Sequence, residues 1–376
     1  MGSDQDGAFY TEGRVRVRTS DRAFLNPESK ASRDISVAFV GAVAKDGKTL
    51  DATAATGIRG MRYAIEAGRR DVTFLEINEG AYGELVRNLE LNGLDPGSAR
   101  NTSLQEFTNA RNGRFSVIDL DPFGGVTPYI YDIMKIVGDG TLLMATATDT
   151  AVLCGAESRA CLRLYDAVPM HNELCHEAGL RILAGYIARV AAQFDFGIAV
   201  RLALAHRHYM RVFLEMRHGV DAVDESIASM GFAMYCDRCA APTHEKAALP
   251  VASMCPRCGS RLRSAGKMWL GSLYDKSAIG KAMALLDDRE AGARTVRMLS
   301  TISGELDTPF YYSLAAMTAR LHVGSVPIRA VLDALGSLGY NATRTHLDPN
   351  GIKTDAPVDA LTGCVRDASA RIAGKK

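Results

Sequence analysis

Short apolar runs alternate with amphipathic stretches over residues 35–230. Runs suited to β-strands cover 49–55, 72–77, 115–121, 141–148, 196–206 and 209–217. Stretches with helical periodicity include 60–68, 80–93 and 171–195. Continuous apolar strands separated by helices are typical of a mostly parallel sheet covered on both faces. The last two runs are joined by only two residues, so they predict an antiparallel hairpin at one edge of the sheet.

The pattern changes after residue 231. Residues 232–275 contain two cysteine pairs among glycines and turn residues, and they predict a small insert. Residues 276–376 contain helix patterns at 277–302, 309–323 and 327–339, followed by a basic, strand-like stretch at 340–357. Short helices followed by such a stretch predict a smaller α+β unit that resembles a winged helix. We therefore expect three parts, 1–231, 232–275 and 276–376, the first a Rossmann-like α/β domain.

Composition excludes some classes of protein. The chain has 376 residues, of which 47% are hydrophobic and 23% charged, as in a globular protein of more than one domain. A net charge of +1 predicts that any nucleic-acid surface is a local patch. No apolar run reaches the roughly 20 residues that span a bilayer. The N-terminal residues lack the apolar core of a signal peptide, so we expect a cytoplasmic protein without a membrane partner.

Four of the eight cysteines form two Cys-x-x-Cys pairs. Cys236 and Cys239 make the first pair, and Cys255 and Cys258 follow after fifteen intervening residues. This spacing suits a tetrahedral thiolate site for zinc, and four protein ligands leave no open position for catalysis. The sequence therefore predicts a structural zinc knuckle. The alternatives are a pair of disulfides or a site that has lost its metal.

A glycine turn follows the first predicted strand. In LDATAATGIRGMR (50–62), Gly57 and Gly60 permit a tight turn, and the start of the next helix offers free N–H groups. The second strand then reaches Glu76, an acid that can accept both hydroxyls of an adenosine ribose. The turn lacks the three-glycine dinucleotide pattern and the Lys-Ser/Thr pair of a triphosphate loop. It therefore fits either a nucleoside site or an ordinary strand-to-helix turn.

The third predicted strand ends in Asp121-Pro122-Phe123-Gly124. Ligands bind at the carboxyl ends of parallel strands, so this motif is expected beside the same crevice. The exocyclic amine of a nucleobase is a poor nucleophile because its lone pair is conjugated into the ring. The Asp121 carboxylate and a backbone carbonyl fixed by Pro122 can accept the amine protons. Phe123 offers a stacking face that contributes about 1–3 kcal/mol. The alternative is a strand-end turn with a capping acid and a core ring.

These motifs resemble a known family. The DPFG motif is similar to the Asp-Pro-Pro-Tyr-type motif of amino-directed methyltransferases, and nearly the whole chain resembles the tRNA guanosine-26 N2-dimethyltransferase family. The matching segments occur in family order and comprise FLNPESKASRDISV (24–37), DATAATGIRGMR (51–62), LEINEGAYGELVRNLELNG (75–93), LDPFG (120–124), HYMRVFLE (208–215), the four cysteines, WLGSLYD (269–275) and GIKTDAP (351–357). The resemblance implies a class I methyltransferase fold and S-adenosylmethionine as cofactor.

The resemblance also implies the cofactor contacts. Arg33 would hold S-adenosylmethionine from the N-terminal segment, Arg59 would contact its methionine carboxylate, and Glu76 would bind the ribose. The family has an Asn-x-Asp-Ala element near the adenine, where this chain has Ser103 and Leu104 in place of the aspartate and alanine. A serine hydroxyl can still bind the adenine amine, although less strongly than a carboxylate does.

The implied substrate is a guanosine in tRNA. The base must leave its helical stack to enter a pocket, where Asp121 would be the catalytic acid/base and Phe123 the stacking ring. The products would carry one or two methyl groups on N2 of guanosine 26, and a monomeric enzyme is expected. Basic residues could contact RNA phosphates, and the candidates are Arg238, Arg257, Arg261, Arg263, Lys267, Arg344, His346 and Lys353.

Two other functions fit parts of the pattern. One is an amino-methyltransferase that acts on rRNA or on N6 of adenine in DNA. The other is a non-catalytic RNA-binding protein that retains a cofactor pocket. The presence of Asp121, Arg59 and Glu76 together argues against the second of these. A methyl-transfer assay on unmodified tRNA distinguishes all three functions.

Overall fold

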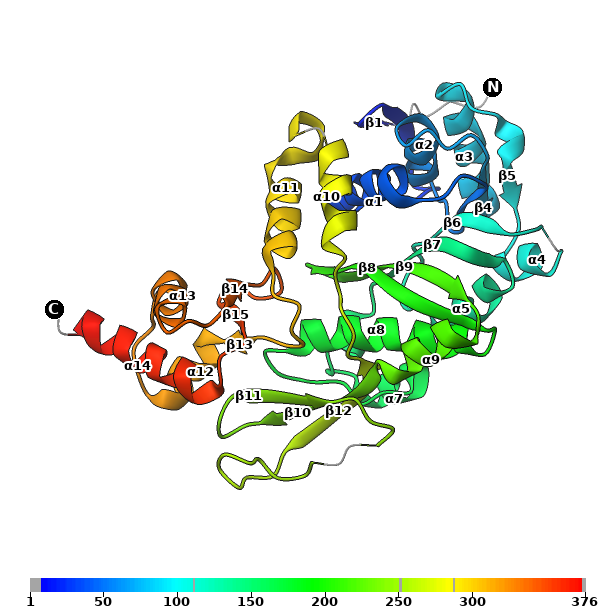
Figure 1. The fold of residues 1–376 in the computed structure, drawn as a ribbon. Helices are drawn as coiled ribbons and strands as arrows, with labels where there is room; N and C mark the ends of the chain where they lie inside the picture. Colours follow the sequence, from blue (N-terminus) through cyan, green and yellow to red (C-terminus); the bar gives the residue numbers. More distant parts are fainter. Residues whose placement is uncertain (1–7, 111, 250–251, 287, 374–376) are drawn as a thin grey trace.

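The computed structural model describes residues 8–110, 112–249, 252–286 and 288–373. Seven strands of these described residues form one mixed sheet (Figure 1). They are β3 (Thr49–Asp51), β4 (Val72–Glu76), β5 (Ala99–Asn101), β6 (Phe115–Leu120), β7 (Val137–Ala147), β8 (Phe196–His206) and β9 (Tyr209–His218). Their order in the sheet is β5-β4-β3-β6-β7-β9-β8, and β9 is antiparallel to both of its neighbours. The predicted parallel sheet with an antiparallel edge hairpin is confirmed.

The strand order creates a site at the carboxyl ends of the strands. β3 pairs with β4 on one side and with β6 on the other, so the connections diverge at this point of the sheet. Such a switch point leaves a crevice between neighbouring loops. In β6, the side chains of Val117, Ile118 and Leu120 are fully buried. A strand that is covered on both faces favours apolar residues at successive positions. For this reason the apolar pattern of the sequence predicted β6.

Helices cover both faces of this sheet. They are α1 (Lys30–Val43), α2 (Ile58–Ile65), α3 (Glu79–Leu91), α4 (Leu104–Asn109), α5 (Thr127–Met134), α6 (Thr150–Leu153), α7 (Ser158–Tyr165), α8 (Cys175–Ala192) and α9 (Val220–Ala228), with short 3-10 turns at Pro27–Ser29 and Pro96–Ser98. α1 lies on one side of the sheet and α5 and α8 lie on the other (Figure 1). The expected helices at 60–68, 80–93 and 171–195 correspond to α2, α3 and α8.

An N-terminal hairpin, which the strand pattern did not predict, packs against α2 and α3. Its strands are β1 (Ala8–Glu12) and β2 (Val15–Thr19), and they pair in antiparallel register. Val15 and Val17 alternate with arginines, and both valines are fully buried. Asn88 of α3 accepts a hydrogen bond from the Arg18 backbone at 2.7 Å. Glu12, the last residue of β1, is buried and accepts hydrogen bonds from Arg33 of α1 and Arg62 of α2.

The cysteine-rich segment forms a small antiparallel sheet. β10 (Met230–Cys236) pairs with β11 (Ala241–Glu245) and with β12 (Arg263–Trp269). Gly266 of β12 exchanges two backbone hydrogen bonds with Val168, at 2.6 and 2.8 Å. Gly185 lets α8 approach β12 closely, since an added Cβ would lie 2.9 Å from the backbone nitrogen of Trp269. These contacts attach the segment to the α/β domain.

The C-terminal unit has winged-helix topology. Its elements are α10 (Lys276–Leu285), α11 (Asp288–Gly304), β13 (Tyr312–Ser313), α12 (Leu314–Leu321), α13 (Ile328–Ser337), β14 (Ala342–Arg344), β15 (Gly351–Thr354) and α14 (Val358–Ala373). β15 pairs antiparallel with both β13 and β14, so the strand order is β13-β15-β14. A helix pair between the first two strands and a loop between the last two match the predicted arrangement. The final helix α14 was not predicted.

Packing divides this C-terminal region. Ile279, Leu299 and Ile302 of α10 and α11 belong to the same apolar core as the main sheet. A separate core includes Leu314 of α12 and Val331 of α13, together with Ala240 of the cysteine-rich segment. The first two helices therefore pack on the α/β domain, and the later elements share a second core. The boundary expected at residue 276 stays a prediction.

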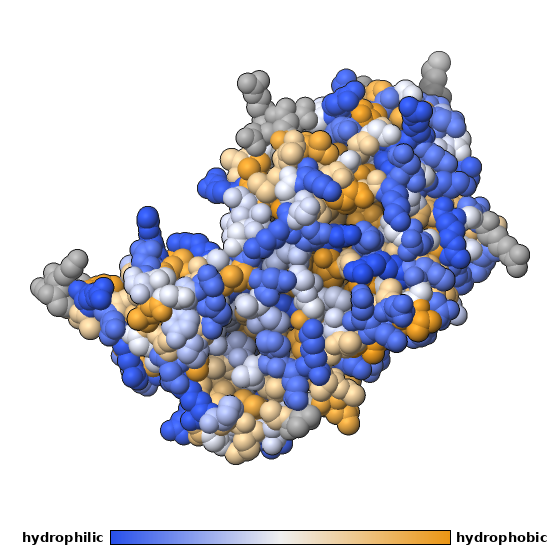
Figure 2. All heavy atoms as spheres, viewed as in Figure 1, coloured by the Kyte–Doolittle hydropathy of each residue, from blue (hydrophilic) through white to orange (hydrophobic). Residues whose placement is uncertain are grey.

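The surface combines hydrophilic and apolar side chains. Hydrophilic side chains cover most of the face drawn in Figure 2, with small apolar patches scattered among them. Among the described residues, no helix combines the length and apolarity that a bilayer crossing requires.

Candidate active site

A cavity of about 720 Å³ lies at the carboxyl edge of the sheet. The ends of β3, β4, β6 and β7 and the loop after β5 all contribute to its lining. Every residue predicted to bind the cofactor or the base, apart from Gly57, lines this one cavity. The motifs lie far apart in the sequence, and the parallel sheet brings them together at the place where ligands bind in such folds.

The glycine turn connects β3 to α2. Gly57 has a left-handed backbone with φ of 79°, which a residue with a side chain rarely adopts, and it forms the N-cap of α2. An added Cβ at Gly60 would clash with the ring of Phe74 and lie 3.0 Å from a carboxylate oxygen of Asp51. Gly57 itself does not line the cavity, whereas its neighbours Thr56 and Ile58 do. The glycines therefore set the shape of the turn, and Thr56 and Ile58 beside Gly57 line the cavity.

Glu76 is held rigidly at the end of β4. One carboxylate oxygen accepts a hydrogen bond from the Ala55 backbone at 2.9 Å, and the other accepts from the Asn78 backbone at 2.8 Å. These two contacts orient the carboxylate across the glycine turn while its side chain lines the cavity. The remaining lone pairs can accept hydroxyl groups, as an adenosine ribose would supply.

Asp121 follows β6 and forms an ion pair with Arg59 of the glycine turn. The Arg59 side chain is 7% exposed, whereas that of Asp121 is 29% exposed and reaches the cavity. Burial acts to raise the pKa of Asp121, but the guanidinium groups of Arg59 and Arg211 outweigh it and hold this pKa below its usual value. Asp121 is therefore ionised at neutral pH, which is the state that can accept protons from an amine.

Phe123 presents its ring to solvent beside the acid. It is 75% exposed, and its edge meets the ring of Phe24 at a centroid distance of 4.8 Å and an angle of 69°. Gly124 closes the turn with φ of 78°, and its backbone N–H donates to the hydroxyl of Thr148 at 2.8 Å. A large exposed ring on a braced turn is available for stacking. The sequence pattern did not indicate that Phe24 would contribute a second ring.

The remaining residues predicted to bind the cofactor also line this cavity, and Arg33 and Ser103 form hydrogen bonds with other residues of the chain. Arg33 of α1 is buried and makes two hydrogen bonds to Glu12, at 2.7 and 2.6 Å. Ser103 is the N-cap of α4 and exchanges capping hydrogen bonds with Glu106. Leu104 is buried and lines the cavity. Arg33 thus shapes the cavity wall through a fixed ion pair.

A buried charge cluster below the site was missed from the sequence. Asp119 accepts a hydrogen bond from Arg211 at 2.6 Å and another from the hydroxyl of Tyr63. Arg59 lies 3.7 Å from the same carboxylate. Burial and the neighbouring Asp119 raise the pKa of Asp51 to about 7. Arg59 and Arg211 therefore pair with acids behind the cavity. In the sequence, only the two aspartates of IDLD (118–121) indicated this cluster.

The four cysteines of the zinc-knuckle prediction converge. Their sulfur atoms all lie within 4.8 Å of one another, and none of the four cysteines is in a disulfide. Cys236 and Cys258 are 3.5 Å apart, and Cys239 and Cys255 are 4.0 Å apart. Tetrahedral zinc with bonds of about 2.3 Å places its sulfur ligands about 3.8 Å apart. The donor set and spacing fit that metal.

Comparison with known proteins identifies the family. A family model described as N2,N2-dimethylguanosine tRNA methyltransferase matches residues 6–366. The tRNA (guanine(26)-N(2))-dimethyltransferase of Methanothermobacter thermautotrophicus is 34% identical over 367 residues, which cover 93% of this chain and 96% of that protein. The chain belongs to the N2,N2-dimethylguanosine tRNA methyltransferase family. This finding confirms the resemblance that the motifs indicated.

Other members of the N2,N2-dimethylguanosine tRNA methyltransferase family agree over the whole chain. The relative from Thermococcus kodakarensis, with the same name as the first, is 35% identical over 380 residues, covering 94% of this chain and 97% of that protein. A solved structure of Trm1 from Pyrococcus horikoshii with S-adenosyl-L-methionine has a TM-score of 0.87 and 34% identity. It covers 95% of this chain and 99% of its own. The predicted class I methyltransferase fold is confirmed.

Two of the predicted phosphate contacts are wrong for this family member. Lys353 is buried, and its ammonium group lies 3.5 Å from Glu177 and 3.9 Å from Glu305. The His346 side chain is also buried and bonds to Glu305 at 2.7 Å. Lys353 therefore joins the C-terminal unit to α8 of the main domain, whereas His346 pairs within residues 276–376. A basic stretch in sequence cannot show that its charges turn inward. Other basic candidates are exposed, namely Arg238, Arg257, Arg261, Arg263 and Arg344.

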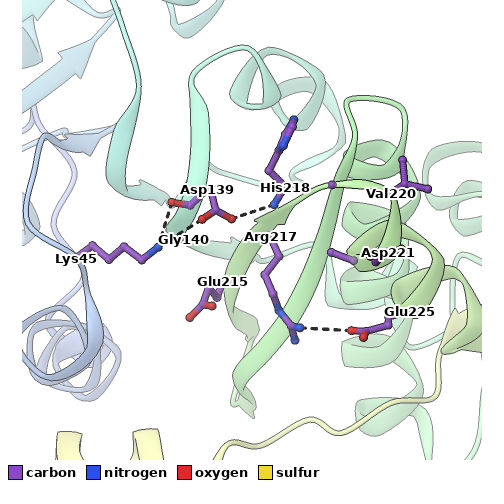
Figure 3. Close-up of a pocket in the computed structure, with 11 residues that line it drawn as sticks. Lys45, Asp139, Gly140, Glu215, Arg217, His218, Val220, Asp221 and Glu225 are labelled. Carbon is purple, nitrogen blue, oxygen red and sulfur yellow. Dashed lines mark hydrogen bonds and ion pairs between the residues drawn. The ribbon is translucent and has the colours of Figure 1, made fainter.

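A second concavity, of about 480 Å³, lies at the opposite edge of the sheet. Figure 3 shows Lys45 beside Asp139 near the start of β7, and Arg217 beside Glu225 of α9. These charges pair with one another at 3.6 and 3.4 Å. The concavity is at the amino ends of the parallel strands, and none of the predicted site residues lines it.

Proposed function

We propose that this protein transfers methyl groups from S-adenosylmethionine to the exocyclic N2 of a guanosine in tRNA. The observation that supports this activity most directly is the ionised Asp121 beside the exposed Phe123 in one cavity with Glu76 and the glycine turn. Family membership supplies the class of substrate. The names of the relatives support guanosine 26 as the target and dimethylation as the outcome.

In the proposed cofactor site, Glu76 accepts the ribose hydroxyls at the end of β4. Ser103 and Leu104 face the adenine from the start of α4, and Arg59 lies at the end of the glycine turn that receives the methionine carboxylate. Arg33 supports this wall through Glu12. S-adenosylmethionine supplies a sulfonium methyl group that a correctly placed amine can attack. The same cofactor in the related Trm1 structure supports this assignment.

The residues of this chain then position the amine. The extruded guanine stacks on Phe123, and Asp121 with the backbone carbonyl of Pro122 accepts the N2–H protons. The N2 lone pair forms the new N–C bond as the C–S bond breaks, and S-adenosylhomocysteine leaves. Asp121 or water takes the surplus proton. Positioning accounts for most of the acceleration in such a step, and Arg59 keeps the Asp121 carboxylate ionised.

The tRNA contacts are proposed for the exposed arginines of the cysteine segment and of the C-terminal unit. Recognition of the RNA body through phosphates fits a protein with near-neutral net charge and local basic patches. We also propose that one chain acts as a monomer. The eight cysteines are all free, which is consistent with the proposed cytoplasmic location.

The proposed metal is a structural zinc ion on Cys236, Cys239, Cys255 and Cys258. Four thiolates complete a tetrahedral site, so they would stabilise the fold of the β10–β12 segment and leave the chemistry to Asp121. Arg257, between the last two cysteines, forms an ion pair with Asp359 of α14 at 2.5 Å. A folded knuckle would therefore also support the C-terminal unit.

The test measures methyl transfer from labelled S-adenosylmethionine to unmodified tRNA. Wild type should label the tRNA, and Asp121→Asn, which keeps the shape but removes the charge, should lose at least 100-fold in rate, about the usual loss for a proton acceptor. Asp221→Asn, an exposed acid of the concavity in Figure 3, is the matched control and should keep full activity. Binding of tRNA without labelling in the wild type would refute the proposal, as would labelling of rRNA or DNA alone.

A further inference from the structure

A second group of metal-binding side chains lies outside the four-cysteine segment. It comprises Cys154, Cys175 and His176, whose ligand atoms lie within 4.8 Å of one another. Cys154 directly follows α6, whereas Cys175 and His176 are the first residues of α8. The sequence spacing of these residues is not that of a metal motif, and only the fold brings them together.

The loops that carry these residues are packed tightly. Gly155 has φ of 87°, and an added Cβ there would lie 2.8 Å from the backbone oxygen of Met170. The ring of His171 is within hydrogen-bond distance of the Cys154 carbonyl, at 3.2 Å. Leu153 and Leu174, which precede the two cysteines, are fully buried. The backbone packing therefore holds Cys154 against the start of α8.

The spacing of the three side chains suits zinc. Bonds of about 2.3 Å to sulfur and about 2.0 Å to nitrogen place tetrahedral ligands about 3.5–3.8 Å apart. Groups already within 4.8 Å of one another need movements of about 1 Å to reach this geometry. Two cysteines and one histidine form a known donor set for zinc. Two thiolates would also balance the charge of a divalent ion.

We propose that Cys154, Cys175 and His176 bind a zinc ion, separate from the ion of the four-cysteine segment. The cysteines are half-buried and His176 is exposed, so the fourth position opens to solvent and is filled by water. The site would tie the segment that follows β7 to α8. That segment starts at Thr148, which contacts Gly124 of the proposed active-site turn. The zinc site does not depend on the proposed methyl transfer.

The test counts zinc in the full-length protein by inductively coupled plasma mass spectrometry. Each protein is equilibrated with excess zinc chloride in a reducing buffer and then desalted. We expect the double variant Cys154→Ala/Cys175→Ala to bind one zinc ion fewer per chain than the wild type does. Cys161→Ala, which removes a buried thiol of α7 outside the group, is the matched control and should lose none. An equal zinc content in the wild type and the double variant would overturn the proposal.

A second measurement does not rely on the cysteine variants. Cobalt replaces zinc, and its visible absorption reports the ligand set. His176→Ala changes an exposed side chain, so circular dichroism should show an intact fold. We expect the cobalt bands to shift in His176→Ala and to stay unchanged in His208→Ala, an exposed histidine of the turn between β8 and β9. Unchanged bands in His176→Ala would overturn the proposal, and so would a Cys154–Cys175 disulfide found by peptide mapping of wild type that is alkylated without prior reduction.

Discussion

Replacing Arg59 by leucine tests the electrostatic core of the site. Arg59 is buried, forms the ion pair with Asp121 and lies 3.7 Å from Asp119. Arg211 would then be the remaining arginine that lowers the pKa of Asp121. Removing one partner of a buried ion pair leaves an unpaired charge, and such changes cost about 3–5 kcal/mol. We therefore expect Arg59→Leu to lower the free energy of unfolding by about 3 kcal/mol or more at pH 7.

The stability difference between wild type and Arg59→Leu should depend on pH. Arg59 lowers the folded-state pKa of Asp121, so the pair contributes stability above the unfolded-state pKa of about 3.9. This contribution disappears as the pH falls through the lower, folded-state value. The stability gap between wild type and Arg59→Leu should therefore be widest near pH 7 and should narrow below about pH 4.

Urea denaturation at pH 7 and pH 3.5, followed by circular dichroism, measures both gaps. Arg217→Leu is the matched control, since Arg217 pairs with Glu225 in an exposed setting, with side chains 44% and 71% exposed. An exposed pair of this kind contributes less than about 1 kcal/mol. A loss in Arg59→Leu as small as that in Arg217→Leu would refute the electrostatic reasoning. A gap of constant size at both pH values would refute the assignment to Asp121.

Four further predictions concern other side chains. The pKa of Asp51 is raised to about 7, so its ionisation destabilises the fold as the pH rises from about 4 to 8. The free energy of unfolding of Asp51→Asn, measured with urea, should therefore increase relative to that of wild type between pH 5 and pH 8. A difference between the two proteins that is the same at both pH values would contradict this. Phe123→Ala should keep wild-type stability and lose about 5- to 150-fold in kcat/KM for tRNA, whereas unchanged kinetics would exclude stacking. Lys353→Met should lower the free energy of unfolding by about 3 kcal/mol, because it leaves Glu177 with an unpaired buried charge. Unchanged stability with weakened tRNA binding would contradict this and would show that Lys353 contacts a phosphate. Cys255→Ser should lose hydrogen-exchange protection in β10 to β12 but not in β3 to β7, and equal protection everywhere would argue against a structural metal.

Local sequence patterns were sufficient to predict the sheet and its binding edge. β6 is mostly apolar and is buried apart from Ser116, and acids at or directly after the ends of β3, β4 and β6 mark the carboxyl edge. Topology then brings Glu76 and Asp121 to one cavity without any side-chain detail. The four cysteines were also predictable, because zinc ligands in a knuckle are close in sequence as well as in space.

Partnerships between distant residues could not be predicted in this way. Arg59 pairs with Asp121, and Arg33 pairs with Glu12 of a hairpin that the strand pattern did not reveal. Periodicity shows which face of an element is buried, but it does not show which charges meet there. The same limit applies to Lys353, where a basic sequence suggested a surface and tertiary packing buried the charge.

The central claim is that the nucleophile is the exocyclic N2 of guanosine 26. The most direct measurement compares methyl incorporation into two synthetic tRNAs, one with guanosine and one with inosine at position 26, since inosine differs only by the missing amine. We expect methylation of the guanosine tRNA, with N2-methylated guanosine as the product in its digest, and background incorporation for the inosine tRNA. Equal incorporation into both tRNAs would contradict the account.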